Sequence, residues 1–214
     1  MEIIYEDQAI TVAIKPPNAV SEQTPQKDGF ADLLAERNPD GYIGVIHRLD
    51  RGVGGVMVYA RTPLAAAHLS RAVQQHQFQK DYLALVHGEP QPASNTLRDL
   101  LFHDRNRNKT FVVDRERRGV KEAILDYEVQ YTKTDDEYGT YSLVKVRLHT
   151  GRTHQIRVQF AHRGHALLGD GKYGARDRCP IALFCYRLAF PHPITNKPLS
   201  FEQEWDRARY NETI

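Results

Sequence analysis

The sequence of 214 residues contains only two cysteines, one tryptophan and two methionines. Two cysteines, Cys179 and Cys185, are too few for a disulfide framework or a cysteine-based zinc site, and this scarcity is typical of the reducing cytosol. No apolar run approaches the roughly 20 residues of a membrane-spanning helix, and the start, Met1 to Asp7, is acidic where a signal peptide is basic. These absences predict a soluble, cytoplasmic protein that needs no disulfide or metal to fold.

Positive charge is distributed unevenly, although the net charge is only +2. Residues 145–178 carry eight basic side chains against two acids, Asp170 and Asp177, and four histidines lie among them. A second basic group consists of Arg105, Arg107, Lys109, Arg115, Arg117, Arg118 and Lys121. Segregated basic charge in a nearly neutral chain suggests a face that binds a polyanion. The alternative is an ordinary solvated surface, which is the usual explanation of a charge run alone.

Hydrophobic periodicity and turn residues predict more strands than helices. The apolar runs predict strands over residues 2–5, 9–15, 42–46, 56–60, 82–86, 124–132, 140–148, 182–190 and 199–202. Helices are expected over residues 30–37, from the capping residue Thr62 onward, and over residues 154–162, whereas residues 91–121 read as loops and short hairpin strands. Most connections between strands are too short for a parallel crossover. The fold class is therefore predicted to be α+β with a mostly antiparallel sheet.

The segment His47-Arg48-Leu49-Asp50 stands between two of these apolar runs and is followed by three glycines in four residues. The glycines supply positive φ angles, or room for another molecule to approach the backbone closely. Asp50 is thus expected at the mouth of a strand–loop–strand unit, flanked by Arg48 and Arg51. Taken alone, Asp50 is more simply explained as a turn residue.

A second segment, Gly151 to Arg157, is dense in hydrogen-bond donors and lies where a strand hands over to a helix. Side chains and backbone N–H groups meet at such a point, as an anion site requires. Arg152 and Arg157 are five residues apart, so one can meet a phosphate while the other meets a carboxylate. Alternatively, Arg157 only pins the helix.

Together these segments resemble the RluA-type family of RNA pseudouridine synthases. Three further stretches agree in the family's order: Lys15-Pro16 after the first hairpin, Lys80 to Gly88, and Gly164 to Asp170 with Tyr173-Gly174. The resemblance implies the pseudouridine synthase fold, with flanking helices and a central RNA-binding cleft. It also implies that residues 1–214 form a single catalytic domain without the S4-like domain that many members carry.

The family's reaction converts a uridine in RNA to pseudouridine, and the resemblance assigns roles to matching residues. The catalytic residues are Asp50 as nucleophile or base, Tyr82 beside the uracil, and Arg157 as the charge that keeps Asp50 ionised. RNA-binding roles fall to His47, Arg48, Lys80, Arg152, Thr153, His154 and Gln155, with Arg48 filling the place of the extruded base. The isomerisation transfers no net electrons, so no cofactor or metal is expected. The partner expected is a structured tRNA or rRNA, with no membrane and no obligatory protein partner, and the protein is expected to be a monomer.

Two departures from the family pattern keep an alternative open. Val53-Gly54-Gly55 replaces a loop that usually contains Thr-Ser-Gly, and Phe184-Cys185 stands where many members have His-Ala. The alternative is an inactive, synthase-like RNA-binding module. A phosphoryl-transfer enzyme is disfavoured because no Gly-rich loop followed by a helix is present, and a metal site from His162 and His165 lacks a third ligand in pattern.

Overall fold

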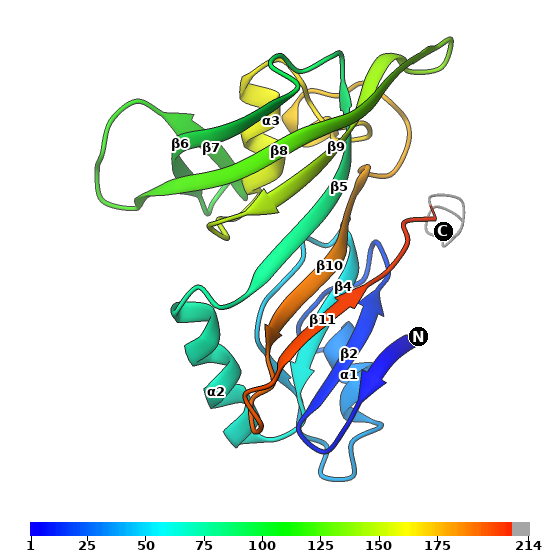
Figure 1. Ribbon diagram of the computed structural model, residues 1–214, viewed down its shortest axis with the longest axis vertical. Helices are drawn as coiled ribbons and strands as arrows, with labels where there is room; N and C mark the ends of the chain where they lie inside the picture. The colour runs from blue at the N-terminus through cyan, green and yellow to red at the C-terminus, as the bar shows by residue number, and fades with distance from the viewer. Residues whose placement is uncertain (207–214) are drawn as a thin grey trace. The chain divides into compact units, whose positions relative to one another are not determined.

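The computed structural model describes residues 1–206 and divides the chain into two compact units (Figure 1). Unit 1 combines residues 1–80 with the segment from Cys185 onward, and unit 2 comprises residues 81–184. The chain passes between the units inside two strands, β5 (Gln79–His87) and β10 (Leu183–Pro191). Each unit is described by itself below, and the single domain over residues 1–214 stays a prediction.

Unit 1 is built on a sheet with the strand order β1-β2-β4-β10. These strands are β1 (Glu2–Glu6), β2 (Ile10–Lys15), β4 (Gly54–Ala60) and the unit 1 part of β10, while β3 (Gly44–Val45) pairs with β4 and β11 (Pro198–Glu202) pairs with β10. Pairing is antiparallel between β1 and β2, β2 and β4, β3 and β4, and β10 and β11. Every residue of β2 and β4 is buried, which explains why both read as continuous apolar runs.

Two helices belong to unit 1, α1 (Phe30–Ala35) and α2 (Pro63–Gln74). The hydroxyl of Thr62 caps α2 by accepting a hydrogen bond from the Ala65 N–H at 3.1 Å, and Pro63 occupies the first turn. Ala65, Leu69 and Ala72 form its buried face. The predicted helix start at Thr62 is confirmed.

Unit 2 has the strand order β5-β9-β8-β6-β7, with β6 (Ser94–Asp104), β7 (Lys109–Val113), β8 (Val120–Asp135) and β9 (Gly139–Leu148). The helix α3 (Gln155–His162) lies on one face of this sheet, as Figure 1 shows, and a short 3-10 helix, η1 (Gly171–Tyr173), follows it. Val158 of α3 packs with Leu101 of β6 and Ala123 of β8 in a small buried core, against which Tyr173 of η1 also packs. The mostly antiparallel α+β fold class is confirmed.

Three predicted boundaries are wrong. The region expected to hold loops and short hairpin strands contains β6, which at eleven residues is longer than expected, and the expected connection from Lys133 to Gly139 is strand as far as Asp135. Conversely, the run from Tyr42 to Ile46 shrinks to the two residues of β3. Most polar side chains of β6 and β8 face solvent, and only a few residues, such as Leu97, are buried. The two strands are held mainly by the hydrogen bonds between them, so their sequences show only a weak apolar pattern.

Candidate active site

Asp50 lies in unit 1 on a turn closed by a 2.9 Å hydrogen bond from the Val53 N–H to the Asp50 carbonyl. The preceding Leu49 is fixed by Ser21, whose hydroxyl donates to the Leu49 carbonyl at 2.9 Å and accepts from its N–H at 3.2 Å. Beyond Asp50, the Arg51 Nε donates to the Asn18 carbonyl at 3.1 Å. The loop that carries the half-buried Asp50 is therefore held from both sides by residues 18–21.

Lys15 supplies a buried cation to this loop. Its side chain is fully buried, and Nζ donates to the carbonyls of Pro16 at 2.9 Å, Ala19 at 2.8 Å and Arg51 at 3.3 Å. Burial lowers the pKa of Lys15 to about 7, and the charge of Asp50 opposes that shift. Lys15 therefore joins β2 to the Asp50 loop and places positive charge near the carboxylate.

His47 is buried in unit 1, where its Nε2 accepts a hydrogen bond from the Val58 N–H at 3.3 Å. Burial, with a smaller effect from the charge of Lys80, lowers the pKa of His47 to about 3. The ring is therefore neutral and carries its proton on Nδ1. Burial also lowers the pKa of Lys80, whereas the electrostatic interaction with Cys185 raises it by less.

Arg48 differs from His47 in being exposed, and its Nη1 lies 2.7 Å from Oε1 of Glu22. An exposed ion pair of this kind contributes little stability, so the guanidinium can exchange Glu22 for another anion. The RNA contacts expected of His47, Arg48 and Lys80 stay predictions.

Gly55 shows why the loop after Asp50 needs glycine. Its φ is +136°, and a Cβ atom at this position would lie 2.4 Å from the carbonyl oxygen of Cys185 and 2.6 Å from its nitrogen. The positive φ predicted for these glycines is confirmed at Gly55. The departure at Cys185 therefore lies directly against the Asp50 loop.

Tyr82 is buried on β5 in unit 2 and alternates with the fully buried Ala84 and Val86. On its N-terminal side, the buried Asp81 accepts hydrogen bonds from Nε of Arg147 at 2.8 Å and from its Nη2 at 3.4 Å. This ion pair fixes the start of the strand in unit 2. The catalytic role of Tyr82 stays a prediction.

The turn before α3 is organised by Gln155. Its Oε1 accepts hydrogen bonds from the Arg152 N–H at 3.0 Å and the Thr150 hydroxyl at 2.8 Å, while its Nε2 donates to the Ile124 carbonyl at 3.1 Å. His154 takes a left-handed conformation at the start of the helix and is buried. Gln155 and His154 thus shape the turn itself.

Arg152 and Thr153 are the more accessible residues of this turn. The Arg152 Nε donates to the Glu122 carbonyl at 2.8 Å, and Thr153 is exposed. Both side chains therefore lie where a solvent-borne anion can reach the turn, and RNA binding by these two residues, His154 and Gln155 stays a prediction.

Arg157 makes a bidentate ion pair with Asp170 inside unit 2. Its Nε donates to Oδ2 at 2.7 Å and its Nη2 donates to Oδ1 at 2.8 Å, and only 5% of Arg157 and 0% of Asp170 is exposed. Gly169 precedes Asp170 with φ +73°, and a Cβ there would lie 2.3 Å from the Cys179 carbonyl oxygen. Arg157 therefore does pin α3 to the η1 segment, and its pairing with Asp50 of unit 1 stays a prediction.

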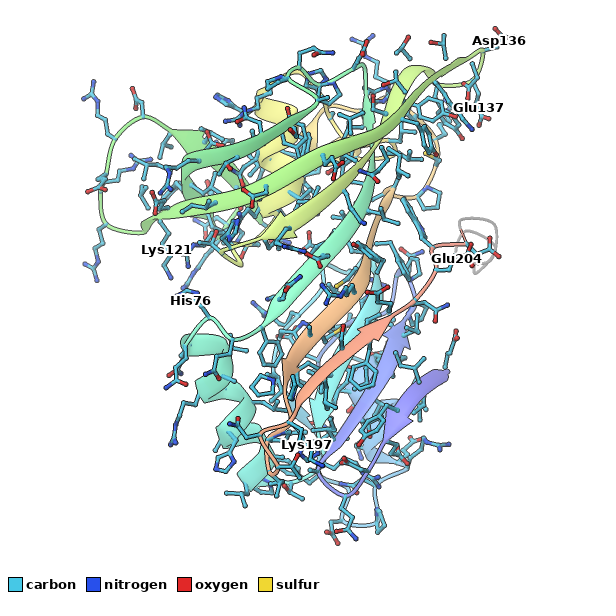
Figure 2. The ribbon with its side chains drawn as sticks, viewed as in Figure 1. His76, Lys121, Asp136, Glu137, Lys197 and Glu204 are labelled. Carbon is cyan, nitrogen blue, oxygen red and sulfur yellow. The ribbon has the colours of Figure 1, made fainter. Side chains whose placement is uncertain are left out.

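Three of the eight basic residues in the stretch over residues 145–178 form ion pairs within unit 2: Arg157 with Asp170, Arg147 with Asp81 and Arg163 with Asp99. Asp81 and Asp99 lie outside the stretch, so a count along the sequence does not reveal the last two pairs. The second basic group is different, because it lies on the β6–β7 and β7–β8 turns and at the strand ends beside them, such as Lys121 at the start of β8 (Figure 2). Among residues 1–206, four exposed members of that group form neither an ion pair nor a cation–π contact: Arg105, Arg115, Arg118 and Lys121. We call these four residues the basic turns.

No set of three or more His, Cys, Asp or Glu side chains that could hold a metal occurs in the described part of the chain. His165, considered above as a ligand, has its Nδ1 2.8 Å from the His87 carbonyl. Over the same residues, no helix combines the length and apolar character needed to cross a membrane.

A family model described as RNA pseudouridylate synthase matches residues 9–162. The chain belongs to this family. It is 34% identical over 226 residues to an uncharacterized RNA pseudouridine synthase of Aquifex aeolicus, covering 95% of this chain and 69% of the relative. It is 32% identical over 225 residues to the ribosomal large subunit pseudouridine synthase D of Vibrio parahaemolyticus, covering 94% and 66%. The RluA-type resemblance is confirmed.

Solved structures agree with this fold. The human RNA pseudouridylate synthase domain containing 1 superposes with a TM-score of 0.79 at 23% identity, covering 95% of this chain and 83% of that one. The human RNA pseudouridylate synthase domain containing 4 gives a TM-score of 0.77 at 22% identity, covering 97% and 89%. These likenesses establish the pseudouridylate synthase fold.

Sequence reasoning about this pseudouridylate synthase assigned no role to three residues that the structure places beside the predicted site residues. Lys15 holds the Asp50 loop, Asp170 holds Arg157, and the ring of Tyr173 faces the Arg157 guanidinium. All three lie in stretches that carried the family resemblance. Their place in the stretches Lys15-Pro16, Gly164 to Asp170 and Tyr173-Gly174 was the sequence feature that could have pointed to them. Position in the sequence does not show, however, which distant group a side chain contacts.

Proposed function

We propose that the chain converts a uridine in RNA to pseudouridine with Asp50 as the catalytic carboxylate. The observation that supports this most directly is the Asp50 loop, where one half-buried carboxylate is flanked by Arg48, Arg51 and the buried Lys15 within the matched family region. A lone acid among cations weakens phosphate binding, so its presence calls for a chemical task.

The reaction needs four events and no net electron transfer. The C1′–N1 bond breaks, the uracil turns, a C5–C1′ bond forms, and the C5 proton leaves to the enzyme or to water. Asp50 acts at the sugar as nucleophile or base, and Tyr82 offers a ring on which uracil can stack and a hydroxyl for the C5 proton. In this proposal residues 1–214 form one catalytic domain, in which Arg157 favours the ionised Asp50. No metal or cofactor takes part.

The substrate proposed is a uridine in a structured cytoplasmic tRNA or rRNA. A stacked base is out of reach, so it must be extruded at a cost of a few kcal/mol, and Arg48 would fill the vacated place. Exposure of Arg48 and its weak pairing with Glu22 support that role. The basic turns of unit 2 add unpaired positive charge for the phosphate backbone. The protein is proposed to act as a monomer, with no obligatory protein partner.

Asp50→Asn tests the proposal, because it keeps the side-chain shape and removes the charge. The matched control is Asp40→Asn, the same chemical change at an exposed residue of the same unit. Position-resolved pseudouridine mapping on tRNA and rRNA incubated with each purified protein should show product with the parent and the control, and none with Asp50→Asn. Turnover by Asp50→Asn at the parent rate would contradict the assignment. RNA binding without product by the parent would favour the inactive, synthase-like module instead.

A further inference from the structure

Tyr173 lies at the junction of three elements of unit 2. Its hydroxyl accepts a 2.8 Å hydrogen bond from the backbone N–H of Thr110 on β7. The same oxygen lies 2.9 Å from Nδ1 of His154, which begins α3. The phenol oxygen therefore accepts from Thr110 and shares a second hydrogen bond with His154, whose tautomer decides which of the two groups donates. Tyr173 thus ties η1 to β7 and to the start of α3.

The ring of Tyr173 faces two cations. The Cζ of Arg157 lies 5.2 Å from the ring centroid, and the Nζ of Lys109 lies 5.3 Å from it. Both distances are within the range of a cation–π interaction. Arg157 is therefore contacted by Asp170 along the Nε–Nη2 edge and by Tyr173 through the ring.

These two contacts restrict different motions of the guanidinium. A bidentate pair with one carboxylate fixes the in-plane direction of a guanidinium but leaves it able to bend out of the common plane. A ring beside the guanidinium opposes that bending. The ring itself is held through Thr110 and His154, so it is a rigid support.

We propose that Tyr173 is a positioning residue for Arg157 in the isomerisation, and this inference rests on the proposed function. Tyr173 touches no reacting atom in this scheme. It holds the Arg157 guanidinium in one orientation, and it links that orientation to β7, which begins at Lys109 directly after the β6–β7 turn. The competing explanation is that Tyr173 only packs against Leu101, Ala123 and Val158.

Tyr173→Leu removes the ring and keeps apolar bulk, whereas Tyr173→Phe keeps the ring and removes the hydroxyl. A cation–π contact of ordinary strength corresponds to a change of about two- to thirtyfold in rate. We expect Tyr173→Leu to lower kcat about tenfold at saturating RNA with little change in KM, and Tyr173→Phe to stay within about threefold of the parent. The matched control is Tyr131→Leu, because Tyr131 is an exposed tyrosine of the same unit with Lys133 4.9 Å from its ring centroid. That control should leave kcat unchanged.

A fluorinated series separates positioning from packing without a change of shape. Phenylalanine with one, two and three ring fluorines at position 173 weakens the negative face of the ring stepwise. A positioning role predicts that kcat falls with each added fluorine, while the melting temperature changes little. A flat kcat across the series, with full activity in Tyr173→Leu, would overturn the inference and leave the proposed function intact.

The NMR signal of the Arg157 Nε–H gives a readout that does not depend on catalysis. In the parent, the bond to Asp170 and the ring should hold this signal in slow exchange with water. We expect the signal to exchange faster in Tyr173→Leu and to be unchanged in Tyr131→Leu. The two proposals fail on different results. If the parent makes no pseudouridine on any RNA, the proposed function is wrong. If the exchange of the Arg157 signal is unchanged in Tyr173→Leu, Tyr173 does not position Arg157.

Discussion

Replacement of Arg157 is expected to damage folding and chemistry together, and the ion pair with Asp170 allows the two effects to be separated. Arg157→Met leaves the wholly buried Asp170 without its bidentate partner. Each charge-assisted hydrogen bond is worth about 1.5–3 kcal/mol, and breaking a buried pair from one side typically costs about 3–5 kcal/mol. We therefore expect Arg157→Met to lose about 3–5 kcal/mol of unfolding free energy, measured by urea unfolding at pH 7.

The double variant Arg157→Met/Asp170→Leu removes both charges. Because apolar groups of similar volume can replace a buried ion pair at little cost, we expect its stability to return to within about 1.5 kcal/mol of the parent. Single-turnover pseudouridine formation should nevertheless stay at least a hundredfold below the parent, because the guanidinium proposed to favour the ionised Asp50 is missing. Arg163→Met serves as the control, because its bidentate pair with Asp99 is partly exposed and should cost only about 1 kcal/mol.

Three results would refute this reasoning in different places. A loss below about 1 kcal/mol in Arg157→Met would show that the pair does not stabilise the fold. A double variant as unstable as the single one would show that the unpaired Asp170 is not the cause. Parent-like turnover by the double variant would remove Arg157 from the mechanism.

Three further outcomes are expected. Tyr82→Phe should fold and bind RNA nearly as well as the parent but make almost no pseudouridine; near-normal turnover in single-turnover assays would return Tyr82 to packing and stacking. Arg115→Gln/Arg118→Gln should weaken RNA binding and reduce the slope of log affinity against log salt by about 1.4–1.8 units, whereas Lys197→Gln, an exposed change in unit 1, should not. The free energy of unfolding should fall steeply below about pH 4. Four carboxyl groups have a lowered pKa, because burial raises the pKa of each but hydrogen bonds to the carboxylate lower it by more: Asp7, Asp99, Asp126 and Asp177. A depressed carboxyl pKa contributes stability above the unfolded value and loses it as pH falls through the folded value, so Asp99→Asn should flatten the decline in urea midpoint against pH.

The fold class and most element positions could be predicted because the buried strands carry a strong apolar signal. β2 and β4 are buried on all residues, and α2 has its cap, its proline and its apolar spacing in sequence order. β6 and the outer half of β8 were harder, because pairing with a neighbouring strand, which no local window contains, makes these polar segments extended.

The site residues show the same division. Asp50 stood out because its glycines and neighbouring arginines are adjacent in the sequence. The partner of Arg157 did not, because Asp170 comes from a segment thirteen residues later whose geometry depends on Gly169. Likewise, the charge count over residues 145–178 did not show that Arg147 and Arg163 pair with Asp81 and Asp99, because these acids come near only through the folding of the sheet.

The interrupted path of the chain through unit 1 sets the order in which the Asp50 loop can be completed during synthesis. β4 and β10 are neighbours in the unit 1 sheet, and Gly55 lies against the backbone of Cys185, yet the whole of unit 2 is translated between them. Chains emerge from the ribosome N-terminal end first. A nascent chain that has exposed Asp50 but not Cys185 therefore lacks the strand that closes the loop. The carboxylate proposed to be catalytic, although encoded early, therefore reaches its final setting only after unit 2 has been translated.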